Sequence, residues 1–209
     1  IRDRYDREVY ATSGERILLW FNLIYNNQEI PMGSEIAIPS NPTFEVRALG
    51  SFKQLPGCPD YVHTAMSKEE ISRLCLNECY NPSNERYLID RIEIVKILPT
   101  QNLDSLDEAI QDPWKTFECI DNGQGCSFSF EDKEFSNSKE NAIYYVRAIQ
   151  EQTDAVGGDP LRCEYNEEGE CIKIKPCYAS GPDFDPSDDC LAPIGERAWS
   201  SPIFLNYLN

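Results

Sequence analysis

The sequence is poor in histidine, and this scarcity limits the chemistry that the chain can perform. Its 209 residues include a single histidine, His63. Hydrolytic zinc and multi-metal sites use two or more imidazoles, and Ser-His or Cys-His catalysis needs a positioned histidine base. A lone histidine near an aromatic residue is more typical of a surface or packing position. We therefore expect no catalytic residue, no metal ligand and no bound cofactor in this chain.

Basic residues are also scarce, and long apolar runs are absent. Lys and Arg total 19 against 36 Asp and Glu, so the formal net charge is −17. Such an acidic chain repels phosphate backbones and anionic lipid head groups. The longest apolar run, residues 17–25, is interrupted by Asn22 and is too short to cross a bilayer. No phosphate-binding loop or dinucleotide fingerprint occurs. Nucleic-acid partners and membrane insertion are therefore not expected.

Cysteine, in contrast, is abundant. Nine cysteines exceed what a reduced cytosolic protein of this size usually carries. We therefore expect an oxidising location: secreted, periplasmic or at the cell surface. The chain opens with the charged Ile-Arg-Asp-Arg in place of a signal peptide. We interpret it as a processed piece of an exported polypeptide.

The cysteine spacing predicts disulfide pairings. Six cysteines flank short turn-rich stretches, so a local bridge is the simplest pairing for each. The expected local bridges are Cys119 with Cys126, Cys163 with Cys171, and Cys177 with Cys190. The remaining trio is Cys58, Cys75 and Cys79. Because Cys75 and Cys79 would lie one helical turn apart, we expect Cys58 to bridge one of them and the third thiol to stay free or to pair outside the chain. A zinc knot is the rival interpretation, but it needs four convergent ligands, and the sequence contains no C-x-x-C.

The dominant period of the hydrophobic pattern is two, which is typical of β-strands. The expected strands are residues 17–25, 35–38, 43–49, 91–97, 127–130, 141–150 and 199–205. About seven short strands predict a mainly β chain with an Ig-like β-sandwich. Apolar residues on both faces make 141–150 a central strand covered on both sides. The alternation in 91–97 slips at Val95, which indicates a bulge or double cover. Pro202 favours an edge position for the last strand.

One short helix and one long loop region complete the expected fold. Ser67 and Glu70 form a capping box ahead of a short apolar stripe, and Asn81-Pro82 should end that helix. A weaker helical turn is expected within residues 105–110, and 81–85 should be a connection. Residues 152–193 are rich in Gly, Pro, Asp and Cys, so we expect a disulfide-stapled insertion there.

Two further patterns suggest ligands, each with a structural alternative. Residues 183–189 alternate carboxylates, as a calcium loop does. However, Asp188 stands where such a loop needs its glycine and Ile194 where it needs a bidentate glutamate, so calcium is not expected and an Asx-turn loop is favoured. The aromatic content of 11% could line a sugar-binding face, although core packing explains most such residues.

Several phrases together resemble a known family. They are Arg7-Glu8-Val9-Tyr10-Ala11-Thr12-Ser13-Gly14 with Arg16-Ile17, Pro31-Met32-Gly33, Arg91-Ile92-Glu93-Ile94-Val95-Lys96, Asp112-Pro113-Trp114, Tyr144-Tyr145-Val146-Arg147-Ala148 and Glu196-Arg197-Ala198-Trp199-Ser200-Ser201-Pro202-Ile203. In this order they resemble the C-terminal third of a bacterial family of exported proteins, a domain of unknown function related to the polymerase-and-histidinol-phosphatase (PHP) metallohydrolases.

The resemblance implies a domain organisation. Residues 1–16 would be the tail of an upstream β/α barrel or its junction, and residues 17–209 the appended sandwich with the 152–193 insertion. The barrel would hold two or three divalent metals that activate water, and none of its ligands can be placed on this chain. Thr12, Ser13 and Arg16 would then lie nearest to any substrate. Arg16 could pair with an anionic group or form a structural ion pair at the junction.

Two functions follow as expectations. The first is a non-catalytic C-terminal sandwich of an exported PHP-like metallohydrolase-family protein, whose partner is the upstream catalytic-like domain. The second is an extracellular structural or binding module that assembles with copies of itself, with surface partners or with glycans.

Overall fold

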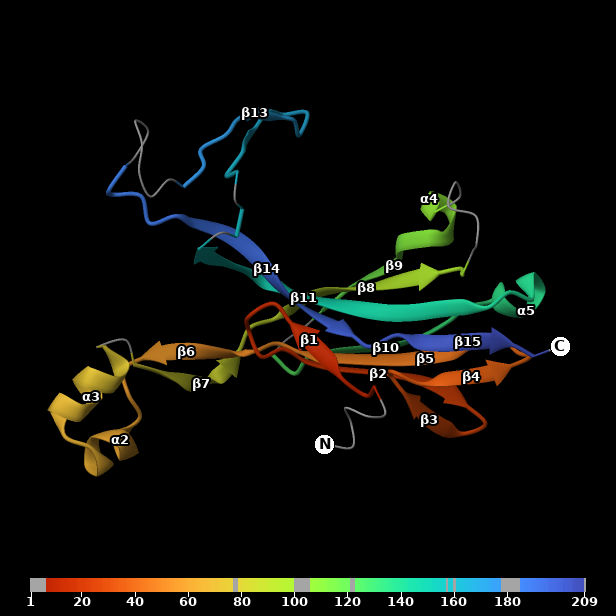
Figure 1. Ribbon diagram of the computed structural model, residues 1–209, viewed down its shortest axis with the longest axis horizontal. Coiled ribbons are helices and arrows are strands. Elements are labelled where there is room, and N and C mark those ends of the chain that lie inside the picture. Colours follow the sequence, from red (N-terminus) through yellow and green to blue (C-terminus); the bar gives the residue numbers. More distant parts are fainter. Residues whose placement is uncertain are drawn as a thin grey trace.

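The chain folds around a β-sandwich, as the sequence predicts, with two arms projecting from one end (Figure 1). The coordinates are a computed structural model, and they describe residues 7–76, 79–99, 106–120, 123–156, 158–159, 161–177 and 185–208. None of the helices in these ranges is long and apolar enough to cross a membrane. We refer below to the larger sheet as sheet A and to its partner as sheet B.

Sheet B consists of four antiparallel strands in the order β10-β5-β2-β3. The strands are β2 (Leu18–Tyr25), β3 (Gln28–Pro31), β5 (Thr43–Leu49) and β10 (Cys126–Glu131). In β5 the alternation is strict: Phe44, Val46 and Ala48 are buried, while Glu45 and Arg47 are exposed. One face of sheet B therefore packs into the core and the other meets solvent.

Sheet A contains seven strands. They are β1 (Tyr10–Thr12), β4 (Glu35–Ile38), β8 (Ile89–Ile97), β9 (Ile110–Glu118), β11 (Ala142–Val156), β14 (Leu191–Ser200) and β15 (Ile203–Tyr207). The long strand β11 pairs with β8 on one side and with β14 and β15 on the other. Its predicted central position is confirmed. The inner residues Ala142, Tyr144 and Val146 are buried, whereas the outer residues Tyr145 and Arg147 are only half-buried, so the cover is complete on one face alone.

The predicted edge position of Pro202 is wrong. Residues 199–205 are split into the end of β14 and the start of β15, and Pro202 lies in the break. Both halves have partners on each side, because β1 pairs with β14 and β4 pairs in parallel with β15. A proline needs only a position where no ladder N–H is required. The break supplies it, while the Pro202 carbonyl still accepts a hydrogen bond from Gly33 N at 3.0 Å.

The irregularity at Val95 is a bulge in the β8–β9 ladder. Ile94 pairs with Lys115 and Lys96 pairs with Gln111, so Val95 alone faces the three residues 112–114 of β9. Such bulges redirect side chains, and here Trp114 packs against Tyr144 with ring centroids 6.0 Å apart. The extra residues of this bulge belong to β9 and not to residues 91–97. Ile94, Val95 and Lys96 are all buried, so cover on both sides, the other alternative predicted for the slip at Val95, is what the structure shows there.

Aromatic rings fill the middle of the sandwich. Phe44 stacks on Phe21 and Phe130 with ring centroids 5.3 and 5.1 Å apart. It also meets Tyr144 from the opposite sheet at 4.8 Å. Such offset and tilted contacts are favourable geometries for aromatic pairs, and they add to the stabilisation from burial. Two short helices, α4 (Leu106–Ala109) and α5 (Phe135–Ser138), lie at the end away from the arms (Figure 1).

The first arm, residues 51–88, is a two-stranded ribbon that carries two helices. The elements are β6 (Phe52–Pro56), α2 (Asp60–Ala65), α3 (Lys68–Cys75) and β7 (Tyr80–Arg86). The capping box of Ser67 and Glu70 is confirmed. The helix ends at Cys75, where Leu76 adopts a left-handed conformation, and not at Asn81-Pro82. Those two residues belong to β7, so the expected connection at 81–85 is instead a strand of an isolated ribbon, which tolerates a proline.

The second arm extends the paired ends of β11 and β14 and carries the hairpin of β12 (Glu164–Tyr165) and β13 (Cys171–Lys173). This arm is the predicted disulfide-stapled insertion. The three predicted local bridges are present: Cys119–Cys126, Cys163–Cys171 and Cys177–Cys190. Cys58 bridges Cys79, one of the two partners that the sequence left open. Cys75 is the remaining free thiol. Three of the four bridges lie in the arms, where little other packing is available.

Candidate functional site

The family resemblance implies that Thr12 and Ser13 lie near a substrate, and both residues lie at the β1 edge of sheet A. Thr12 pairs with Ala198 of β14. The Ser13 hydroxyl donates to the Glu196 carboxylate and accepts a hydrogen bond from Arg197 N at 2.9 Å. Its backbone N–H also donates to the Arg197 carbonyl at 2.9 Å. The hydroxyl is thus committed to fixing the edge of the sheet.

Arg16 lies apart from Ser13, at the base of the first arm. Its side chain is exposed, and it lines a cavity of about 440 Å³ together with Ser51, Phe52 and Pro82. An exposed guanidinium can bind an anion, but the Glu15 carboxylate also lines this cavity, together with Gln54. Neither Thr12 nor Ser13 lines this cavity.

The outer face of sheet A carries a denser charged cluster. The Arg147 guanidinium, 17% exposed, binds the Glu93 carboxylate at 2.7 Å and also pairs with Asp112. Arg91 Nε approaches Glu93 at 2.9 Å. Burial disfavours the charged form of Arg147, but the hydrogen bond that it donates to Asp112 and the nearby carboxylates outweigh burial and raise the pKa of Arg147. This network links the neighbouring strands β8, β9 and β11.

A second ionic cluster lies inside the sandwich. Lys96 Nζ donates to Asp132 Oδ2 at 2.6 Å, and the Tyr144 hydroxyl donates to the same oxygen at 2.6 Å. Glu134 N donates to the other oxygen of Asp132 at 3.0 Å. Lys96 and Asp132 are 7% and 1% exposed, so both charges are buried. We interpret the cluster as structural, because both side chains are buried and paired with each other.

Burial and hydrogen bonding oppose each other in this cluster. Burial raises the pKa of Asp132, but the hydrogen bonds from Lys96 and Tyr144 lower it more, so the carboxylate stays ionised. Burial together with the hydrogen bond to Asp132 raises the pKa of Tyr144. Tyr144 is therefore a permanent donor to the Asp132 carboxylate.

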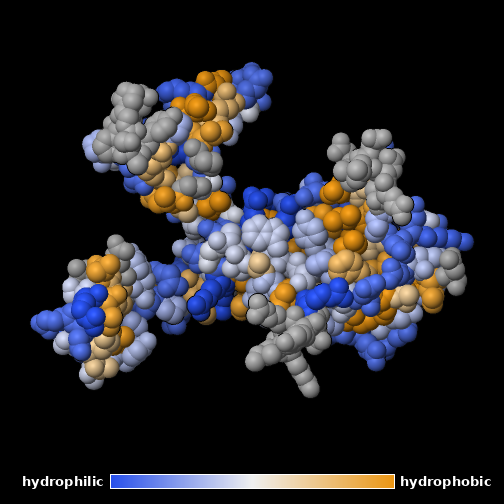
Figure 2. Space-filling view, viewed as in Figure 1, coloured by the Kyte–Doolittle hydropathy of each residue, from blue (hydrophilic) through white to orange (hydrophobic). Residues whose placement is uncertain are grey.

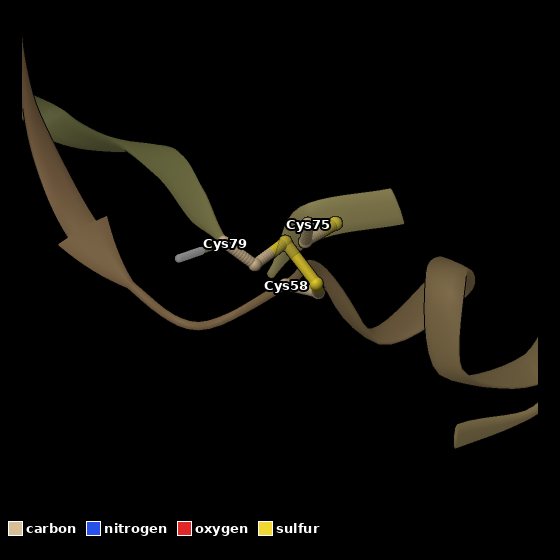
Figure 3. Close-up of side chains that lie close together, drawn as sticks. All are labelled: Cys58, Cys75 and Cys79. Atoms are coloured by element: carbon tan, nitrogen blue, oxygen red, sulfur yellow. A yellow bond between two sulfur atoms is a disulfide. The ribbon is translucent and has the colours of Figure 1, made fainter. Parts of the chain in front are cut away.

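Three sulfur atoms converge on the first arm. The Sγ atoms of Cys58, Cys75 and Cys79 all lie within 4.8 Å of one another, and all three residues are half-buried. Figure 3 shows the Cys58–Cys79 disulfide with the Cys75 thiol beside it. Within the part of the chain that the structure describes, this is the one group with the spacing of a metal site. Because two of the three sulfurs are bonded to each other, they offer no thiolates to zinc. We call Cys58, Cys75 and Cys79 the sulfur cluster.

In the acidic segment of the second arm, each described carboxylate accepts a hydrogen bond from a group within the same arm. Asp188 binds Arg162 through two hydrogen bonds of 2.7 and 2.5 Å. The hydrogen bonds from Arg162 hold the pKa of Asp188 far below its usual range. Asp185 accepts from Ser187, and Asp189 from Leu191 N, which are Asx-turn contacts. Residues 183–184 of the proposed calcium loop lie outside the described residues.

The solvent face of sheet B holds a shallow trough of about 510 Å³. Trp20, 42% exposed, lies at one end with the Arg47 guanidinium 5.2 Å from its ring centre. Asn22 Nδ2 donates to Glu29 Oε2 at 2.9 Å along the same face. Glu45, Val46, Phe128 and two serines complete the lining. The trough thus combines one exposed indole with several hydrogen-bonding groups.

The lone histidine is exposed in α2, as expected for a surface residue. Comparison of the chain with protein-family models, with curated proteins and with solved structures finds no match. The resemblance to the PHP-related family therefore rests on the sequence phrases alone.

Sequence reasoning missed two features of these sites. It did not anticipate the buried ion pair, because Lys96 ends an otherwise apolar inner face and Asp132 follows a strand at a distance of 36 residues. It also did not anticipate that the third thiol lies beside the bridge. The cysteine trio was visible in the sequence, but its convergence depends on the early end of α3.

Proposed function

We propose that this chain is the non-catalytic C-terminal β-sandwich portion of an exported PHP-like metallohydrolase-family protein. The metal-dependent hydrolytic site lies upstream of these residues, and the upstream domain is the partner of the sandwich. The single histidine supports this assignment, because an activated-water metal site needs several convergent ligands.

The observation that carries the proposal is where the family-like phrases lie in the fold. Five of them, although far apart in sequence, fall on the neighbouring strands β1, β14, β11, β8 and β9 of sheet A. The sixth, Pro31-Met32-Gly33, lies against the first: a Cβ on Gly33 would approach the Arg7 carbonyl oxygen to 2.1 Å. Five of the six phrases therefore lie on adjacent strands of one sheet, which supports the resemblance.

The charged groups of the same phrases also gather. Arg91, Glu93, Asp112 and Arg147 form the network on the outer face of sheet A. Ser13 and Glu196 extend the polar surface to the β1 edge. A rigid, charged face next to the N-terminal strand is suited to contact an upstream domain, since interfaces between domains of one chain are relatively polar.

The location follows from the disulfides. Four bridges in a chain of this length persist in oxidising surroundings and are rare in the cytosol. We therefore place the protein in the secreted, periplasmic or cell-surface compartment.

An intact-mass measurement on the native material tests the proposal. The protein is recovered from the producing cells with an antibody raised against the sandwich and weighed without proteolysis. We expect a polypeptide several hundred residues longer than this chain, with a histidine-rich upstream part. A stable native species of this length, found in ordered assemblies, would refute the proposal and favour a self-assembling surface module.

The trough on sheet B favours a second candidate, an extracellular module that binds glycans. An exposed indole can stack on the C–H face of a pyranose, while carboxylate, amide and hydroxyl groups bind sugar hydroxyls. Screening the chain against a panel of bacterial and plant polysaccharides tests this candidate. Binding that is lost in Trp20→Ala but kept in Tyr61→Ala, an exposed aromatic on the first arm, would support it. Equal retention in both variants would exclude the trough.

A further inference from the structure

The sulfur cluster brings a free thiol within reach of a disulfide. The three Sγ atoms lie within 4.8 Å of one another, and the bridge joins Cys58 to Cys79. Cys75 is the remaining thiol. All three residues are half-buried, so their sulfurs remain accessible to solvent. Exchange proceeds when a thiolate attacks a disulfide sulfur within reach.

We propose that the sulfur cluster is a thiol–disulfide exchange site, in which Cys75 and Cys79 compete for Cys58. The Cys75 thiolate attacks Sγ of Cys58, a Cys58–Cys75 bond forms, and the Cys58–Cys79 bond breaks. Cys79 leaves as a thiolate and takes up the proton that Cys75 released. One disulfide and one thiol are present before and after the step, so no oxidant or reductant is needed.

Cys58 is the sulfur attacked because of where the three residues lie in the chain. Cys75 is the last residue of α3, and Cys79 immediately precedes β7. A bond between Cys75 and Cys79 would close a very small ring, because only three residues separate them in the sequence. Cys58 comes from the other side of the ribbon, at the end of β6, and approaches both without such a ring.

The two strand ends of the ribbon are also joined by hydrogen bonds, which form whichever disulfide is present. Gly57 N donates to the Cys79 carbonyl at 2.7 Å, and Asn81 Nδ2 donates to the Gly57 carbonyl at 2.8 Å. Pro56 also pairs with Tyr80 in the ladder. These contacts keep Cys79 beside Cys58 after its bond is broken. The attack is therefore reversible.

The packing of the helix allows the small movement that exchange requires. Neither α2 nor α3, both fully described, contains a buried residue. Leu74 and Leu76 are 57% and 76% exposed, and Figure 2 shows the apolar surface that the first arm presents. With so little side-chain packing, α3 can shift towards Cys58 at low cost. Exchange then moves the free thiol from Cys75 at the end of α3 to Cys79, which directly precedes the exposed Tyr80 at the start of β7.

Trapping the free thiol in the wild-type chain tests the exchange directly. The oxidised chain is held at mildly alkaline pH for increasing times, quenched with acid, and alkylated under denaturing acidic conditions that stop exchange. Peptide mapping then locates the label. We expect one thiol per chain, with the label shared between Cys75 and Cys79 and reaching a constant ratio. A label that remains on Cys75 alone at every time, or that appears on Cys58, would overturn the proposal.

A serine variant measures whether Cys75 reaches Cys58. Cys79→Ser removes the original partner, and we expect a Cys58–Cys75 bridge and no alkylatable thiol. The matched control Cys75→Ser should keep Cys58–Cys79 and also contain no alkylatable thiol. Far-ultraviolet circular dichroism confirms that both variants retain the sandwich, which lies outside the arm. Two alkylatable thiols in folded Cys79→Ser, at Cys58 and Cys75, would refute the exchange geometry.

Discussion

Lys96 and Asp132 place two opposite charges inside the sandwich, where Tyr144 and a backbone N–H complete the hydrogen bonding of the carboxylate. A buried ion pair gains little over an apolar pair of similar volume, because desolvation offsets much of its attraction. Removing one partner, however, leaves the other charge unpaired in the core. The single residues of this cluster are therefore far more sensitive to substitution than surface charges.

Lys96→Met tests this sensitivity. The substitution leaves Asp132 ionised and without its cation, so we expect the free energy of unfolding to fall by about 3–5 kcal/mol. Urea denaturation followed by tryptophan fluorescence measures the change. Lys53→Met is the control: the Lys53 side chain is 42% exposed and its carboxylate partner Glu85 is 4.0 Å away, so a change below about 1 kcal/mol is expected. Equal effects of the two substitutions would contradict the buried pair.

The same cluster predicts how stability depends on pH. The pKa of Asp132 is lowered in the folded state, against about 3.9 for an aspartate in an unfolded chain. Its stabilisation is therefore complete above about pH 4 to 5 and is lost as the pH falls through the lowered folded pKa. We expect the free energy of unfolding to decrease more steeply on acidification in the wild type than in Asp132→Asn. Parallel pH profiles from urea titrations would show that Asp132 does not contribute.

At the scale of elements, the first arm is joined to the sandwich by a close backbone contact. A Cβ on Gly50 would meet the Tyr87 carbonyl oxygen at 1.9 Å. Nearby, Ser51 N donates to Gln150 Oε1 at 2.9 Å, and Arg86 donates to the Gly50 carbonyl at 2.6 Å. These contacts fix the angle at which the ribbon leaves the sandwich, and they require glycine at position 50.

Gly50→Ala should disrupt this junction. The clash is with backbone and cannot be relieved by a side-chain rotation, so we expect a loss of about 1–3 kcal/mol and a lower melting temperature. Gly14→Ala is the matched control, because its added Cβ would meet nothing closer than the Glu196 carboxylate at 3.5 Å. Calorimetry of both variants gives the comparison, and an unchanged melting temperature for Gly50→Ala would mean that the junction is loosely packed.

The elements also show what the sequence could predict. The strands with clean alternation, such as β5, are found where the pattern indicates, because one face packs into the core and the other meets water. Strand β9 could not be recognised, because residues 112–114 form a bulge that breaks its period. The end of α3 was also misjudged, since the pattern marks Pro82 as a stop, but Leu76 ends the helix earlier.

The candidate site was predictable in part for the same reason. The spacing of cysteines along the sequence is enough to predict the disulfides that close short loops. The convergence of Cys75 on the Cys58–Cys79 bridge, and the meeting of Lys96 with Asp132, depend on how separate segments pack. Contacts of this kind between separate elements cannot be predicted from the hydrophobic periodicity of the sequence.

On the scale of the whole molecule, stability is divided between a packed core and cross-linked arms. The sandwich is held by buried aromatic and aliphatic side chains, whereas the arms contain few buried residues and three of the four disulfides. Each such bridge contributes about 2–4 kcal/mol by constraining the unfolded chain. The order of the arms should therefore depend on oxidation.

Reduction and chelation should accordingly have different effects. We expect a reductant to increase amide hydrogen exchange and proteolysis in both arms, while a chelator at neutral pH changes neither the arms nor the melting temperature. Exchange mass spectrometry measures both treatments on the same preparation. Melting by the chelator with no response to the reductant would mean that bound metal, and not disulfides, orders the chain.

We propose that this chain is a cross-linked scaffold and that hydrolysis belongs to another part of the protein. The most direct test is to supply the purified chain with manganese or zinc, remove excess ion, and measure bound metal and phosphoesterase turnover together. We predict no stoichiometric metal and no turnover above the protein-free rate. A tightly bound multinuclear cluster, or metal-dependent turnover by these 209 residues, would contradict the account.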